Sequence, residues 1–174
     1  MKVRLRYAVA LCLIALATTL IPLATQGDDF ALAATADNQC WKFKPSERGF
    51  TTKMNQERSA QGLGTLSLDP ELSRAARKHT QEMWSQELLY HTPSDKLRFR
   101  VTNWMTIGEN VGVGAVVQSL HDAFMNSPAH KANIMYKTYK HVGVGVAQKN
   151  DRMWVTVIFE ATDEPGTPLS MPRC

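Results

Sequence analysis

The spacing of apolar residues along this chain is helical through its middle and alternates near its end. Between residues 50 and 61, Phe50 and Met54 fall on one face of a predicted helix, and Gly62 is a typical helix stop. The next helix begins with Asp69 as N-cap and Pro70 in the first helical position. Its apolar face is formed by Leu72, Ala75, Ala76, His79 and Met83. On that face, His79 is expected to be a core histidine with a hydrogen-bond partner.

Two more helices are predicted before the period changes to two. The first covers residues 116–126, and the second begins at Ser127 and Pro128, with Ser127 as its N-cap. Residues 142–146 then alternate valine with glycine, and a turn at Asn150-Asp151 leads into a β-rich run over residues 153–159. This order predicts an α+β fold, with helices on both sides of a small, mostly antiparallel sheet.

The first residues of the chain have the pattern of a secretory signal peptide. Basic residues at positions 2–6 precede an apolar run over residues 7–25, and small-residue sites follow at Ala31-Leu32-Ala33 and Ala34-Thr35-Ala36. We therefore expect a signal peptide over residues 1–36, cleaved after about residue 33 or 36, and a secreted, extracellular protein. An uncleaved membrane anchor is the alternative.

The mature chain is expected to contain a single domain. An N-terminal segment (37–50) carries Cys40, the folded domain covers residues 51–161, and residues 162–174 form a tail that is rich in proline and small polar residues. Cys12 would leave with the signal peptide, so Cys40 and Cys174 are expected to form one disulfide in an exported protein. Two free thiols or an intermolecular bridge are the alternatives that the sequence leaves open.

The charge of the chain excludes one class of partner. Twenty Lys and Arg residues against sixteen Asp and Glu give a net charge of +4, and the two signs are interleaved without a dense basic cluster. We therefore expect no nucleic-acid partner, and no membrane contact except through an uncleaved signal segment. A monomer is expected, while its extracellular ligand or protein partner cannot be read from the sequence.

Chemically active side chains lie at breaks between the apolar segments. They are His91, Glu109, Ser127 and His130. Two imidazoles and a carboxylate can hold a divalent cation such as zinc, or transfer protons near neutral pH. These residues are too far apart in sequence to form a local metal motif. Only the fold can bring them together in one cavity.

Five segments in this order resemble a known family. The segments are Asn55-Gln56-Glu57-Arg58 with Gly62-Leu63 and Asp69-Pro70-Glu71-Leu72, His91-Thr92, Gly108-Glu109-Asn110-Val111, Asn126 to Ile134, and Val142 to Val146. Together they resemble the bacterial CAP superfamily, whose SCP-like domains are named after cysteine-rich secretory proteins, antigen 5 and pathogenesis-related-1 proteins. The resemblance covers residues 52 to 160. One segment alone would be weak evidence, but five in register are specific.

This resemblance implies a three-layer α-β-α sandwich with a central cavity. In the family, two histidines and two acidic residues line the cavity, and in some members they hold a divalent cation, often zinc. His91, Glu109 and His130 match three of these four positions and are the implied metal ligands. Ser127 stands at the fourth position, where eukaryotic members have a glutamate, and is expected to line the cavity.

Three functions follow from this interpretation. The preferred one is a secreted domain whose cavity binds a divalent cation or a small ligand without turnover. A hydrolase is the alternative, either metal-dependent or with Ser127, His130 and Glu109 as nucleophile, base and orienting group. However, the chain has no His-Glu-x-x-His helix and no Gly-x-Ser-x-Gly elbow. A lipid- or sterol-binding protein, an activity reported for some family members, is the third.

Overall fold

The computed structural model describes residues 41–162. The predicted signal peptide, both cysteines of the expected Cys40–Cys174 disulfide and nearly all of the predicted tail lie outside these residues, so those expectations stay predictions. Within residues 41–162, no helix is long and apolar enough to cross a membrane.

Five helices and four strands make up this part of the chain. The helices are α1 (Pro45–Ala60), α2 (Pro70–Gln86), α3 (Ser94–Arg100), α4 (Val117–Asn126) and α5 (Pro128–Ile134). The strands are β1 (Ser67–Leu68), β2 (Thr106–Gly114), β3 (His141–Lys149) and β4 (Arg152–Ala161). They form one sheet in the order β1-β3-β4-β2, in which only the short β1–β3 pair is parallel. The predicted α+β class and mostly antiparallel sheet are confirmed.

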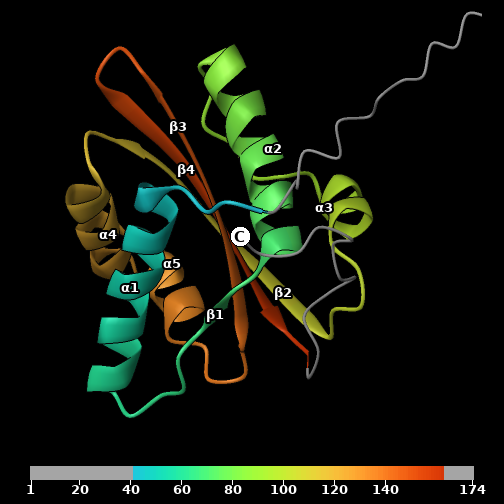
Figure 1. Ribbon diagram of the computed structural model, residues 1–174, viewed down its shortest axis with the longest axis vertical. Coiled ribbons are helices and arrows are strands. Elements are labelled where there is room, and N and C mark those ends of the chain that lie inside the picture. The colour runs from blue at the N-terminus through green and yellow to red at the C-terminus, as the bar shows by residue number, and fades with distance from the viewer. Residues whose placement is uncertain (1–40, 163–174) are drawn as a thin grey trace, which may run out of the picture. The chain divides into compact units, whose positions relative to one another are not determined.

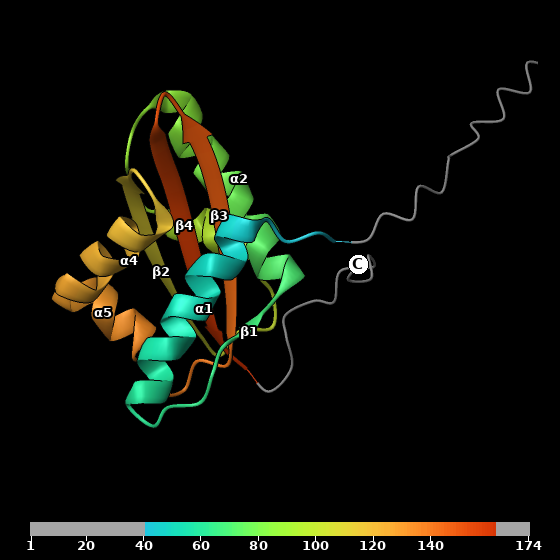
Figure 2. The same cartoon turned by 60° about the vertical axis from the view of Figure 1, so that its left-hand side comes forward.

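Helices cover both sides of this sheet. Figures 1 and 2 show α1, α4 and α5 on one side and α2 on the other, with α3 beside α2. The alternation in β3 explains how α2 packs so closely. A Cβ atom at Gly143 would collide with the backbone of Leu72 and Ser73, and one at Gly145 with the backbone of Ala76 and Arg77. Glycine at these two positions therefore lets the helix backbone rest directly on the strand.

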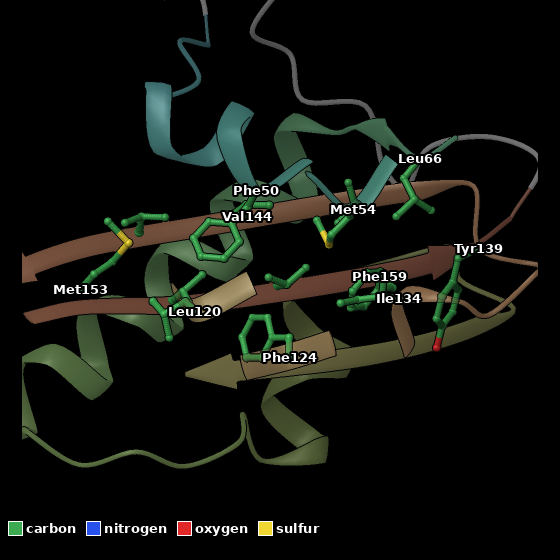
Figure 3. Packing of buried hydrophobic residues seen from close by; sticks show 14 of the residues in the cluster. Phe50, Met54, Leu66, Leu120, Phe124, Ile134, Tyr139, Val144, Met153 and Phe159 are labelled. Carbon is green, nitrogen blue, oxygen red and sulfur yellow. The ribbon is translucent and has the colours of Figure 1, made fainter. Parts of the chain in front are cut away.

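The valines of β3 face the opposite side and join the main core. Val142, Val144 and Val146 pack there with Phe50 and Met54 of α1 and with apolar residues of α4, α5 and β4. Figure 3 shows this cluster, in which Phe124 of α4 and Phe159 of β4 lie between helices and sheet. Helices α1, α4 and α5 are thus held mainly by this buried face.

Most predicted helix starts are confirmed, with two corrections. The Asp69 side chain accepts a hydrogen bond from Leu72 N at 2.9 Å, as an N-cap should. The first helix begins at Pro45 instead of residue 50, because Glu47 in its first turn accepts a hydrogen bond from Lys44 N at 2.8 Å ahead of the apolar face. Ser127 occupies the N-cap position of α5, but its side chain makes no capping hydrogen bond. Its carbonyl oxygen instead accepts the first helical bond, from Lys131 N at 2.8 Å.

Candidate functional site around edge strand β2

Glu109 lies on the edge strand β2 and holds the segment that follows α2. Its Oε1 accepts hydrogen bonds from His91 Nδ1 and from Thr92 N, both at 2.9 Å. Its Oε2 accepts a hydrogen bond from Thr92 Oγ1 at 2.5 Å. The Glu109 side chain is only 6% exposed, whereas that of His91 is 61% exposed. A carboxylate nearly closed off from water therefore fixes an exposed imidazole.

The geometry of this contact also fixes the proton on the imidazole. An ionised carboxylate can only accept hydrogen bonds, so His91 must carry its proton on Nδ1. In a neutral ring, the other nitrogen, Nε2, then has an unshared electron pair. His91 is thereby prepared to bind a cation through Nε2.

Asn110, the next residue of β2, points to the opposite side of the sheet. Side chains alternate along a strand, and Glu109 shares its side with Ile107 and Val111, which pack against residues of α2. Asn110 instead donates from Nδ2 to the carbonyl oxygen of His130 at 3.0 Å. Two consecutive residues of one edge strand thus hold the two histidine segments from opposite sides.

Asn133 completes the contacts between β2 and α5. Its Nδ2 donates to Asn110 Oδ1 at 2.8 Å and to the Glu109 carbonyl at 3.2 Å. A Cβ atom at Gly108 would lie 3.0 Å from Asn133 Oδ1 and would also collide with the Tyr139 hydroxyl. Gly108 therefore permits α5, which carries His130, to approach β2 closely.

His130 is half-buried, and its ring lies against Phe124 with centroids 4.9 Å apart. Burial, and secondly the charge of His91, lower the pKa of His130 below the usual histidine value. A lowered pKa keeps the His130 imidazole neutral at physiological pH, which is the form that binds metals.

The structure brings two of the four predicted site residues, His91 and Glu109, into direct contact. The segment of His130 is held against the next residue of the same strand, Asn110. Ser127 is half-buried at the junction of α4 and α5, and no hydrogen bond joins its side chain to another described site residue. Within residues 41–162, no three His, Cys, Asp or Glu side chains are grouped so that they could hold one metal ion.

Three residues that contribute to the site had no role assigned from the sequence. Thr92, Asn110 and Asn133 all belong to the five segments that resemble the CAP superfamily, but none is a typical metal ligand or acid-base group. Their adjacency to His91, Glu109 and His130 was the only available signal. Their role is visible only once the register of β2 against its neighbours is known.

The other histidines are structural in different ways. His79 is a core histidine, as predicted: its Nε2 bonds to the Tyr90 carbonyl oxygen at 2.7 Å. His121 showed no feature in the sequence that distinguished it from a surface histidine. In the structure its side chain is 4% exposed and faces Glu57 at 3.8 Å.

Comparison with known proteins agrees with this architecture. The sequence model described as the cysteine-rich secretory protein family, CAP, matches residues 51–159. The uncharacterized protein YkwD of Bacillus subtilis is 34% identical over 101 residues, which is 54% of this chain and 39% of that protein. This chain therefore spans about two fifths of the length of that relative.

Two solved structures share the fold at low sequence identity. An extracellular protein containing an SCP domain from Bacillus anthracis superposes with a TM-score of 0.61 at 20% identity, over 70% of this chain and 45% of that one. A structure of NaASP2 with Zn²⁺ gives a TM-score of 0.56 at 12% identity, over 76% of this chain and 90% of that one. Because the family match covers most of the described residues and the fold agrees with it, this chain belongs to the cysteine-rich secretory protein family.

Proposed function

We propose that this protein is secreted and that His91 and His130 bind a divalent cation, zinc first of all, without turnover. Glu109 orients His91 in this proposal and is not itself a ligand. The signal-like N-terminal pattern and the extracellular Bacillus anthracis neighbour support secretion. The zinc in the NaASP2 structure supports the choice of cation.

The observation that carries the proposal is the hydrogen bond between His91 Nδ1 and Glu109 Oε1. Histidines that ligate metals commonly donate their second ring N–H to a carboxylate, which fixes the ring and raises its basicity. Thr92 donates two further hydrogen bonds to the same carboxylate, so Glu109 is itself held in place. A metal ligand with this support needs no rearrangement of the protein before it binds.

The residues present fit an open cation site and do not fit a closed one. The two imidazoles are supplied by this chain, but the described residues contain no third His, Cys, Asp or Glu grouped with them. Water or an external ligand would complete the coordination shell. Such a site should be weaker than a structural zinc site with four protein ligands.

The geometry does not favour the hydrolase alternatives. Both oxygens of Glu109 accept hydrogen bonds from His91 and Thr92, so this carboxylate is not poised to take a proton from water. In the part of the chain that the structure describes, no hydrogen bond connects Ser127 with His130. Binding without turnover is therefore the function that these contacts support best.

Zinc titration by calorimetry tests the proposal. We expect His91→Ala and His130→Ala each to abolish measurable binding, and Glu109→Gln to weaken it about 10- to 100-fold, as loss of an outer-shell partner does. His141→Ala, which removes another half-buried imidazole, is the matched control and should bind like the parent. Since protons compete for imidazole, binding should also be weaker at about pH 5.5 than at about pH 7.5. Unchanged binding in the His130 variant would remove that residue from the site.

A further inference from the structure

A separate small pocket is lined by residues of α2 and α3, two helices that lie side by side in Figure 1. Its volume is about 210 Å³. The residues that line it are Arg74, Ala75, Lys78, Phe99 and Arg100. Three of these side chains are cations, and no carboxylate of the described chain is among them. None of the five takes part in the site around Glu109.

Arg100 is the most informative of these residues because its side chain is largely buried and only one of its two terminal nitrogens has a hydrogen-bond partner. Its side chain is 9% exposed, and its Nη2 donates to Glu82 Oε1 at 2.6 Å. Its Nη1 is buried and has no hydrogen-bond partner among the described residues. Leaving a buried charged donor unpaired costs free energy, so this nitrogen marks the place of an acceptor that binds from outside.

Arg74 and Lys78 add two more positive charges on the same face of α2. Residues four apart lie one above the other on a helix, and like charges in this arrangement repel. Neither side chain forms a hydrogen bond or an ion pair with another residue that the structure describes. A bound anion would relieve this repulsion.

Two carboxylates, Glu82 and Glu71, lie near the pocket. Glu82 is paired with Arg100 and also faces His79. Glu71, one turn before Arg74, is buried: its Oε1 accepts a hydrogen bond from Thr102, its Oε2 has no hydrogen-bond partner among the described residues, and Arg74 interacts with its charge. Neither carboxylate lines the pocket, so the cations remain available to a ligand.

Phe99 supplies an apolar surface at the same place. Its side chain is 89% exposed, more than any other large hydrophobic residue described. An exposed phenyl ring beside three cations suits a ligand that combines an anion with an apolar or aromatic group. The pocket is smaller than the roughly 300–1,000 Å³ of sites for drug-sized molecules, so it suits a small ester or a headgroup.

We propose that Arg74, Lys78 and Arg100 form a binding site for a phosphate ester, with Phe99 packing against the ester's apolar part. Arg100 Nη1 donates to a phosphate oxygen, and Arg74 and Lys78 neutralise its charge. The same chemistry is offered by a small phosphate monoester and by the headgroup of an anionic lipid.

Binding can be measured with phenyl phosphate, inorganic phosphate and vesicles. We expect phenyl phosphate to bind more tightly than inorganic phosphate, and Phe99→Ala to remove that difference. The double variant Arg74→Gln/Lys78→Gln should weaken phenyl phosphate binding at least about tenfold, because two charge-assisted contacts are lost. Phosphatidic acid vesicles, compared with phosphatidylcholine vesicles, form the second arm. Binding only to the former identifies a lipid headgroup as the source.

The matched control is Lys96→Gln/Arg98→Gln, which removes the same charge from α3 outside the pocket lining. It should bind like the parent. Both double variants replace solvent-facing cations and should fold and bind zinc as the parent does, so failure here is distinguishable from failure of the cation site. Equal losses in the two double variants, or no binding in either arm, would overturn the proposal.

Discussion

The two sides of the sheet are built from different kinds of contact. On the side of α1, α4 and α5, the buried residues form one continuous apolar cluster (Figure 3). On the side of α2 and α3, the apolar residues form two smaller clusters, around Leu72 and around Met83. Buried polar groups lie on the same side, among them His79, Thr80 and Thr156. The first side is therefore packed mainly by apolar contacts, whereas the second combines smaller apolar clusters with buried hydrogen bonds.

Edge strand β2 is where these two sides meet. Glu109 holds His91 on the α2 side, while Asn110 holds the His130 segment on the α5 side. The proposed cation site therefore depends on both layers, whereas the proposed phosphate-ester pocket depends on α2 and α3 alone. Substitutions on each side should separate these contributions.

The largest loss of stability is expected from substitution of Arg58, a charged residue buried on the mainly apolar side of α1, α4 and α5. This arginine is fully buried and donates hydrogen bonds to the carbonyl oxygens of Gly64, Ile134, Tyr136 and Tyr139. Arg58→Met would leave several buried carbonyls unpaired and should lower the free energy of unfolding by about 3–5 kcal/mol. Arg48→Met, at an exposed site on the same helix, is the control for urea unfolding. A loss below about 1 kcal/mol at Arg58 would mean that water replaces these bonds.

The next effect tests how closely α2 packs on the sheet. Gly145→Val would drive a side chain into the backbone at Ala76 and Arg77, where no flexible neighbour can yield. We expect a loss of about 3 kcal/mol or more in thermal or urea unfolding. Gly64→Ala should change stability by less than about 0.5 kcal/mol, because nothing lies near its added methyl group. Similar behaviour of the two variants would show that α2 is free to shift.

Isosteric substitutions at two neighbouring positions of β4 compare the two sides of the sheet, because adjacent side chains of a strand point to opposite sides. Val155 is buried in the apolar cluster, so Val155→Thr would place a hydroxyl there without a partner and should cost about 1–3 kcal/mol. Thr156 accepts a hydrogen bond from Thr80 Oγ1 at 2.9 Å on the other side. Thr156→Val should cost about 1 kcal/mol or less, since Thr80 can still donate to the Gly145 carbonyl oxygen. Equal losses in urea unfolding would contradict the distinction between the sides.

The smallest effect is a difference in pH dependence. Burial lowers the pKa of His121 on α4, so the unfolded chain binds that proton more readily. The free energy of unfolding should therefore fall as pH drops below about 6.5, and His121→Phe should make this fall smaller.

Burial, assisted by the charge of Asp69, raises the pKa of Glu71 on α2, although the hydrogen bond from Thr102 opposes this shift. Its contribution has the opposite sign.

For Glu71, the folded state binds the proton more readily than the unfolded state does. The free energy of unfolding should therefore gain from this group as pH falls from neutral towards about 4.3. Glu71→Gln should remove that gain. Urea unfolding of both variants over this pH range measures each contribution as a difference from the parent. If the free energy of unfolding of either variant changed with pH in parallel with that of the parent, the role assigned to that residue would be wrong.

Local chemistry explains which elements could be predicted from the sequence. The start of α2 follows from Asp69 and Pro70, and the β3–β4 turn from Asn150 and Asp151, both of which have positive φ angles. In contrast, no apolar residue of α3 is buried, so this helix has no apolar period to detect. Strand β2 carries Glu109 and Asn110 where an ordinary strand would alternate apolar and polar residues.

The residues of the candidate site could be predicted from the sequence, but their contacts could not. Histidine and glutamate stand out by residue type, so His91, Glu109 and His130 could be selected without a structure. The Glu109 carboxylate accepts hydrogen bonds from His91 and Thr92. These contacts depend on strand register and on side-chain direction, which the local sequence does not encode. For the same reason the missing hydroxyl cap at Ser127 could not be predicted from its position before Pro128.

Glu109 is proposed to prepare His91 to bind a cation together with His130. Nitrogen-15 NMR of the imidazole side chains can test this role, because it reports which ring nitrogen carries the proton. We expect His91 in the metal-free protein to be protonated on Nδ1, and added zinc to shift the resonance of one unprotonated ring nitrogen of His91 and of one of His130. Protonation of His91 on Nε2, or zinc-induced shifts confined to other histidines, would contradict it.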